Sequence, residues 1–211
     1  MSDTAIMARM GRRTVADGAY EALRMDAQAG LAVVQAKSAF HDAVMAGRVF
    51  GVCNQAGVTS QAGLSATTPV LTLYNPLGSG VNCVLWYAGA TFSVAFATAG
   101  AVWVAAGTNV AAAAVTGTAT TAHRNLKLGT ASNPAASPLL AATLPAAPVA
   151  IALLGMGLTG AITVAPQIQT LERWFNGSVI LTPGTNISVQ TGVASGASGT
   201  FIEFIWEEVA E

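Results

Sequence analysis

A stretch of 123 residues with only two charged side chains constrains what this chain can fold into. Residues 49–171 contain Arg124 and Lys127 as their only charged residues, whereas an average globular sequence of that length carries about 31. The surface made from this stretch must therefore be covered by small polar residues, by a bilayer or by neighbouring subunits.

A bilayer is the poorer explanation. The most apolar run, residues 149–165, has 17 residues, contains three glycines and lies between Pro148 and Pro166. A spanning helix needs about 20 apolar residues. The opening residues MSDTAIMARMGRR have neither the apolar core nor the cleavage site of a secretory signal. We therefore expect no membrane partner and no secretion.

The uncharged body has the pattern of short strands separated by turns. Apolar, β-branched and aromatic runs alternate with Gly, Pro, Asn and Ser, without helical segments between them. This spacing predicts an all-β antiparallel sandwich or barrel. The expected strands are residues 48–54, 69–74, 81–87, 91–98, 101–105, 149–154, 161–165, 179–182, 186–191 and 200–209.

Several local features sharpen this expectation. In the final run, Ile202, Phe204 and Trp206 alternate with Glu203, Ile205 and Glu207 and are predicted to share the inward face. The segment SVILTPGTNISVQTG, residues 178–192, predicts two strands joined in a tight hairpin. Residues 131–148 hold four prolines and predict a long surface loop, whereas the low-complexity residues 111–121 favour neither state.

The first 47 residues differ from the body and predict a separate arm. Residues 1–48 hold eleven of the nineteen charged residues, and the best helical pattern, residues 39–46, ends at Gly47. The arm has too few large apolar residues to fold alone. We expect residues 1–47 to be a partly helical docking or subunit-contact arm, and residues 48–211 to be the sandwich.

Few residues in the chain can support catalysis. The letters GMGLTG at residues 155–160 match a dinucleotide fingerprint, but β-branched residues and Pro166 follow where a helix is needed. Cys53 and Cys83 lack metal-ligand spacing and are expected to be buried free thiols. No serine lies in a nucleophile-elbow pattern. We therefore expect no catalytic, cofactor-binding or metal-binding residue and no enzymatic activity.

Two groups of charged residues outside the arm each allow two interpretations. The segment HRNLK, residues 123–127, is either a partner-contact loop or an ordinary solvated loop. The acidic residues near position 211 are either a cation site or, as we favour, a solvated strand end; these are Glu203, Glu207, Glu208 and Glu211.

A charge-poor body without catalytic groups favours an oligomeric structural protein, because obligate subunit interfaces are depleted in charge. With a net charge of −1 and a pI near 6.1, the chain has no basic field to attract nucleic acid. The candidate partner contacts are Arg9, Arg12, Arg13 and Phe40 of the arm, with Arg124 and Lys127 of the body.

Three segments of the chain resemble minor structural proteins of tailed-bacteriophage virions: GRVF at residues 47–50, NQAGVT at 54–59 and YNPLGSGVN at 74–82. The runs VILTPGTNISV and FIEFIWEEV resemble the closing strands of a viral or tumour-necrosis-factor-like jelly roll. The resemblance covers residues 45–90 and 175–209. It implies a jelly-roll-like sandwich, often trimeric, that decorates or cements a capsid and has no catalytic residues.

Together, these observations predict a phage virion structural protein, present in the host cytoplasm during assembly. The first expectation is a capsid decoration or cement protein, a homotrimer that stabilises the head by bridging subunits of the major capsid protein or other virion proteins. The alternatives are a tail, fibre or baseplate component and a carbohydrate-binding receptor module.

Overall fold

The structure is a computed structural model that describes residues 40–96, 98–107, 115–157 and 169–211. The chain divides into two units, Met1–Asp42 and Ala43–Glu211, and the architecture below is that of the second. The first unit lies almost wholly outside the described residues, so the arm stays a prediction. The expected helix is present as α1 (His41–Met45). Gly47, with a φ of 74°, ends it in a Schellman motif, with Arg48 N donating to Ala43 O at 3.2 Å.

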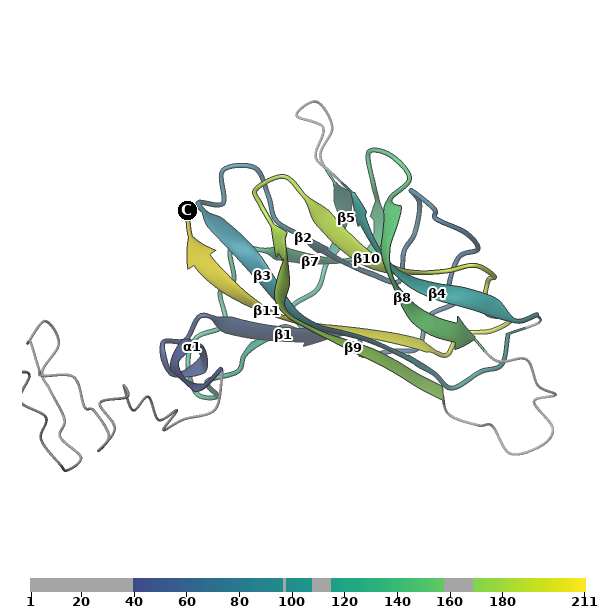
Figure 1. The fold of residues 1–211 in the computed structure, drawn as a ribbon, viewed down its shortest axis with the longest axis horizontal. Coiled ribbons are helices and arrows are strands. Elements are labelled where there is room, and N and C mark those ends of the chain that lie inside the picture. Colours follow the sequence, from purple (N-terminus) through teal and green to yellow (C-terminus); the bar gives the residue numbers. More distant parts are fainter. Residues whose placement is uncertain (1–39, 97, 108–114, 158–168) are drawn as a thin grey trace, which may run out of the picture. The chain divides into compact units, whose positions relative to one another are not determined.

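The described residues form two antiparallel sheets that pack face to face, which confirms the all-β sandwich (Figure 1). The five-stranded sheet has the order β6-β1-β11-β3-β9, and the six-stranded sheet has the order β5-β7-β2-β10-β4-β8. The strands are β1 (Val49–Cys53), β2 (Leu71–Tyr74), β3 (Val81–Phe92), β4 (Gly100–Gly107), β5 (Thr116–Ala119), β6 (Arg124–Asn125), β7 (Ser137–Thr143), β8 (Val149–Gly157), β9 (Gln169–Leu181), β10 (Asn186–Thr191) and β11 (Thr200–Ala210).

The strand pairs are nested along the chain. β1 pairs with β11, β2 with β10, β3 with β9 and β4 with β8, all antiparallel. The first four strands therefore run out and the last four return beside them, like one long hairpin folded over into two sheets. The strands β5, β6 and β7 are inserted between β4 and β8 and extend the sheets at β1 and β2.

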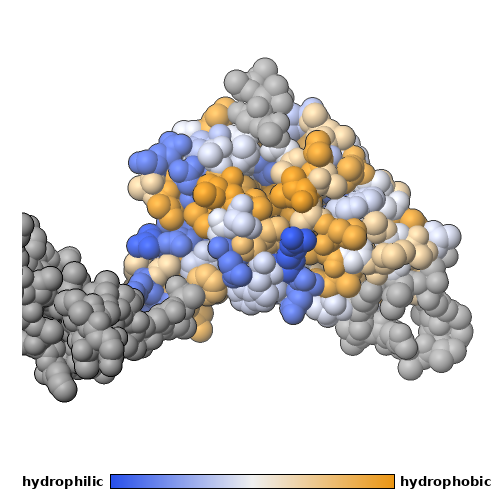
Figure 2. Space-filling model, in the orientation of Figure 1, coloured by the Kyte–Doolittle hydropathy of each residue, from blue (hydrophilic) through white to orange (hydrophobic). Residues whose placement is uncertain are grey.

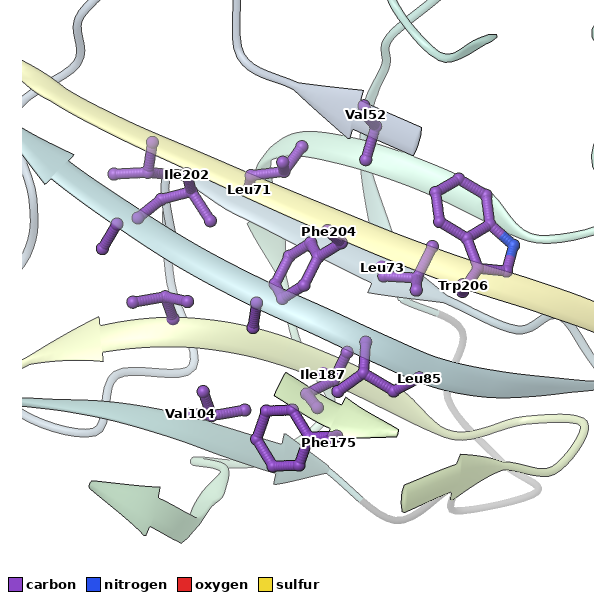
Figure 3. Close-up of a cluster of buried hydrophobic side chains, with 14 of the residues drawn as sticks. Val52, Leu71, Leu73, Leu85, Val104, Phe175, Ile187, Ile202, Phe204 and Trp206 are labelled. Carbon is purple, nitrogen blue, oxygen red and sulfur yellow. The ribbon is translucent and has the colours of Figure 1, made fainter. Parts of the chain in front are cut away.

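The core lies between the two sheets and receives side chains from both (Figure 3). The predicted inward row of β11 is confirmed, because Ile202, Phe204 and Trp206 are all fully buried. The ring of Phe50 on β1 stacks against Trp206 with centroids 5.7 Å apart. The alternation of side chains along a strand therefore places the most apolar row of β11 in the centre of the sandwich.

Residues 54–70 shield part of the outer surface of the six-stranded sheet. Gly63 N donates to Thr191 O at 2.8 Å, and Ser65 N donates to the Gln190 side chain at 3.4 Å. This segment explains why Ser188 and Gln190, which alternate with the inward residues of β10, are still buried. Because β8 lies at the far end of this sheet, beyond β10 and β4, its outer side chains remain exposed.

The expected hairpin at residues 178–192 is wrong in its pairing. The two strands and the turn at Pro183–Gly184 are present, but β9 belongs to the five-stranded sheet and β10 to the six-stranded one. The turn is held by β2 instead, with Gly184 N donating to Asn75 O at 2.6 Å. The segment therefore crosses between the sheets.

Two other expectations from the sequence need correction, and one segment that was left open is now assigned. Residues 131–148 are not one surface loop, because they contain β7, which pairs with β2. The ambiguous low-complexity segment contributes β5 from residue 116 onwards. The expected strand at residues 91–98 is instead the end of β3, which stops at Phe92. The expected strand at residues 161–165 lies outside the described residues.

Candidate functional site

The predicted contact residues of the body, Arg124 and Lys127, form hydrogen bonds within their own subunit. Arg124, in β6, donates from Nη1 to the carbonyl oxygens of Thr121 and His123 at 3.1 and 2.7 Å. Lys127 donates from Nζ to Met45 O at 2.9 Å, which places a positive charge at the carboxyl end of α1. Both residues therefore stabilise local structure, and their predicted role in partner contact is untested.

Of the predicted contacts of the arm, the structure describes only Phe40. Phe40 is half-buried in the turn that precedes α1. The other three, Arg9, Arg12 and Arg13, lie outside the described residues.

Glu207 and Glu208, two of the four glutamates near position 211, are engaged, which corrects the expectation of a solvated strand end for these two residues. Glu208 accepts hydrogen bonds from Ala135 N at 3.0 Å and Ala136 N at 2.9 Å, and from Trp206 Nε1 at 3.2 Å. Glu207 forms an ion pair with Arg48 at 2.8 Å. Glu208 thus ties the segment before β7 to β11, a tertiary contact that no local sequence pattern could predict.

A tyrosine between two carboxylates marks the outer face of the five-stranded sheet. Tyr87 on β3 donates to Glu172 Oε2 on β9 at 3.1 Å, and the register places Glu203 of β11 on its other side. Burial, followed by the nearby charges of Glu203 and Glu172, raises the pKa of Tyr87 far above its usual value of 10. The phenol therefore remains protonated and links β3 to β9 through this hydrogen bond.

Gly89 makes room for this arrangement. A Cβ at residue 89 would lie 2.7 Å from the Tyr87 hydroxyl and 2.9 Å from Glu203 Oε1. Beside Tyr87, the indole of Trp174 is 52 % exposed, with ring centroids 5.0 Å apart at 61°. Trp174 lies within β9.

The largest group of exposed apolar side chains follows β8 and β9. It comprises Val149, Ile151, Leu153 and Met156 of β8 with Trp174 and Ile180 of β9, and we call it the β8–β9 flank. Figure 2 shows hydrophobic side chains gathered on the face of the sandwich along which these two strands run. Each of the six is between 46 % and 69 % exposed.

Close contacts connect the two strands of the β8–β9 flank. Arg173 Nη1 lies 3.5 Å from Leu153 O, and its guanidinium lies 5.4 Å from the ring centre of Phe175. A Cβ at Gly155 would lie 2.9 Å from the side chain of Leu171, so the strands touch where β8 bends. The two strands therefore touch at this point, where an edge of each sheet meets the other.

Sequence reasoning did not find the β8–β9 flank, because it predicted residues 149–154 as a strand without assigning its exposed face. The available signal was the alternation of Val149, Ile151 and Leu153 with the small residues Ala150 and Ala152. Such alternation indicates two different faces, but it does not show which strand becomes the edge of a sheet.

His123 and the two thiols are further candidate reactive side chains among the described residues. The ring nitrogens of His123 face Thr120 O at 3.0 Å and Ser132 O at 3.2 Å, so this histidine holds two parts of a loop together. Both cysteines are free; Cys83 is fully buried, whereas Cys53 is only half-buried. Burial and the charge of Glu208 raise the pKa of the Cys83 thiol to about 12.

Within the described residues, no three His, Cys, Asp or Glu side chains lie close enough together to hold a metal ion. No helix in the same residues is both long and apolar enough to cross a bilayer. Comparison with known proteins gives no match to this chain, whether against family models, curated sequences or solved structures.

Proposed function

We propose that this chain is a non-enzymatic structural protein of a tailed-bacteriophage virion. Its proposed role is that of a capsid decoration or cement protein, which binds the head as a homotrimer and bridges capsid subunits. The virion setting comes from the resemblance of residues 45–90 and 175–209 to such proteins, and the fold and surface add physical support.

A jelly roll is the proposed class of this sandwich. In a jelly roll, eight strands form two four-stranded sheets in which early strands lie beside late ones. The orders β1-β11-β3-β9 and β2-β10-β4-β8 have this arrangement. The inserted strands β5, β6 and β7 then extend it at the β1 and β2 edges.

The observation that carries the structural role is the exposed β8–β9 flank. Exposed apolar patches on monomeric proteins are normally small, and larger ones mark interaction surfaces. Here the patch accompanies a body almost free of charge, in which Tyr87 is held by two carboxylates as a strand-to-strand link rather than free to react. These features favour assembly over catalysis.

The test is immunogold electron microscopy of virions from the source that encodes the chain, with an antibody against residues 43–211. Gold on the heads supports the proposal, and loss of gold after antibody depletion with purified protein controls for specificity. Gold on tails, fibres or baseplates supports the tail alternative instead. Particles without gold overturn a virion role.

A carbohydrate-binding receptor module is the second candidate, because of one observation. The half-exposed indole of Trp174 lies beside Tyr87 and Glu172, and an aromatic platform next to hydrogen-bonding groups can bind a sugar ring. A glycan array separates the two functions. Binding that disappears in Trp174→Ala supports the module, whereas an array without specific binding argues against it.

A further inference from the structure

We propose that the β8–β9 flank is the surface through which this chain binds a second copy of itself. The inference deepens the proposed structural function and rests on it, since it names the partner and surface of the expected oligomer. Its argument comes from the sheet edges, the charges and the apolar area of the flank.

Of the four sheet edges in the described residues, β8 is the least protected against pairing. β6 has only two residues, and β5 has four, Thr116–Ala119, without a large apolar side chain. β9 carries charged residues and bends where Asn176 and Gly177 adopt φ values of 50° and 81°. Short strands, charges and bends are the usual protection of sheet edges.

β8 has nine residues, no charge and no proline. Its protective features are the register shifts in its pairing with β4 and the Arg173 guanidinium beside Leu153 O. A long, apolar edge strand that stays exposed is a predicted site of association or aggregation. Since β8 is both exposed and apolar, we infer that another protein surface covers it.

The charges of the flank favour an identical copy over an acidic or basic partner. Residues 128–171 contain no charged residue, and the charged residues of β8 and β9 are Glu172 and Arg173, both exposed and opposite in sign. A second copy brings the same neutral pair, so each arginine can face a glutamate of the other copy. A strongly charged partner would place a like charge next to either Glu172 or Arg173.

The apolar area is also of the right size. Six side chains that are each about half exposed leave roughly 500–600 Å² of apolar surface in water, at roughly 100 Å² each. A standard interface buries roughly 800 Å² per partner. The outer edge of β8 and the exposed Ala150 can supply the difference, and the six side chains would form the centre of the contact.

The experiment compares the solution mass of full-length variants by light scattering between about 1 and 100 μM. In Leu153→Lys a charge replaces a side chain in the flank that is 54 % exposed. The matched control is Leu77→Lys, in the turn between β2 and β3, where the leucine is 57 % exposed. Because residue type and exposure match, the two variants differ mainly in location.

The wild-type chain is expected to have a mass several times the 21.2 kDa of one copy. Leu153→Lys should dissociate at least ten times more readily, and Leu77→Lys should behave as wild type. Far-UV circular dichroism checks that each variant is folded, and Ile180→Lys, on β9, replaces Leu153→Lys if that variant unfolds. Unfolding of both flank variants would count against the proposal, since it would place these side chains within the chain's own core.

A monomeric wild-type chain at every concentration overturns the inference, and so does an equal effect of Leu153→Lys and Leu77→Lys. These failures are separable from failure of the proposed function. A monomer that still labels heads removes only the self-association, whereas an oligomer absent from virions removes only the virion role.

Discussion

Replacing Trp206 with alanine tests the centre of the sandwich. The indole is fully buried, stacks on Phe50 and donates from Nε1 to Glu208. The change removes on the order of 200 Å² of buried aromatic surface, or about 5 kcal/mol at 25 cal/mol per Å². Measured Trp→Ala losses of about 3–5 kcal/mol agree with this figure. We expect the free energy of unfolding to fall by about 4–5 kcal/mol.

Urea denaturation followed by far-UV circular dichroism measures this loss without relying on the removed fluorophore. Trp174→Ala is the matched control, because that indole is 52 % exposed and should cost no more than half as much. Both variants should be measured at two protein concentrations, since association through the flank adds to apparent stability. Equal losses in the two variants would refute the inward register of β11.

Three further predictions concern other parts of the sandwich. Glu208→Gln should lower the free energy of unfolding by about 1–3 kcal/mol, because an amide cannot accept from all three donors. The variant should also be cleaved faster by elastase within residues 131–136. Unchanged cleavage would contradict the proposed contact between this segment and β11. The free energy of unfolding should fall as pH rises from about 9 to 12, by up to about 1.4 kcal/mol per pH unit. The reason is that the pKa of Cys83 is raised to about 12 in the folded state, so the unfolded chain loses the thiol proton at a lower pH. Denaturation of Cys83→Ala across that range should show a shallower slope, and an identical slope would exclude the thiol as a cause. Gly47→Ala should lower the free energy of unfolding by about 1 kcal/mol, because the φ of residue 47 is 74°, whereas a change near zero would show that α1 does not depend on this cap.

Local pattern was enough to predict the eight strands that pair early with late in the chain, but not the inserted strands β5, β6 and β7 or the pairing of the strands. The alternation of Ile202, Phe204 and Trp206 determines which face of the strand is buried, because a register shifted by one residue would turn these apolar side chains toward water. The turn at Pro183–Gly184 was also readable. However, a turn of this kind can join two paired strands or connect strands of different sheets. Which of the two occurs here depends on the pairing of β9 with β3.

The sequence did not predict β7, because this strand contains a proline. Pro138 lies opposite Leu73 of β2, in a strand close to the edge of the sheet, where a missing amide proton is tolerated. The candidate site was less predictable than the fold. The exposure of Leu153 depends on β8 becoming the outermost strand, and the engagement of Glu208 depends on a loop more than 70 residues earlier in the chain.

The nesting of the strands has a consequence for how the chain is made. Cys53 of β1 pairs with Glu203 of β11, a residue synthesised 150 positions later. At translation rates of roughly 5–20 residues per second, β1 waits about 8–30 s for its partner. During that interval β1 and β3 both lack β11, the strand that lies between them. Such long-range pairing slows folding, so the yield of native protein in a cell should depend on the rate of translation and on chaperones that shield these strands.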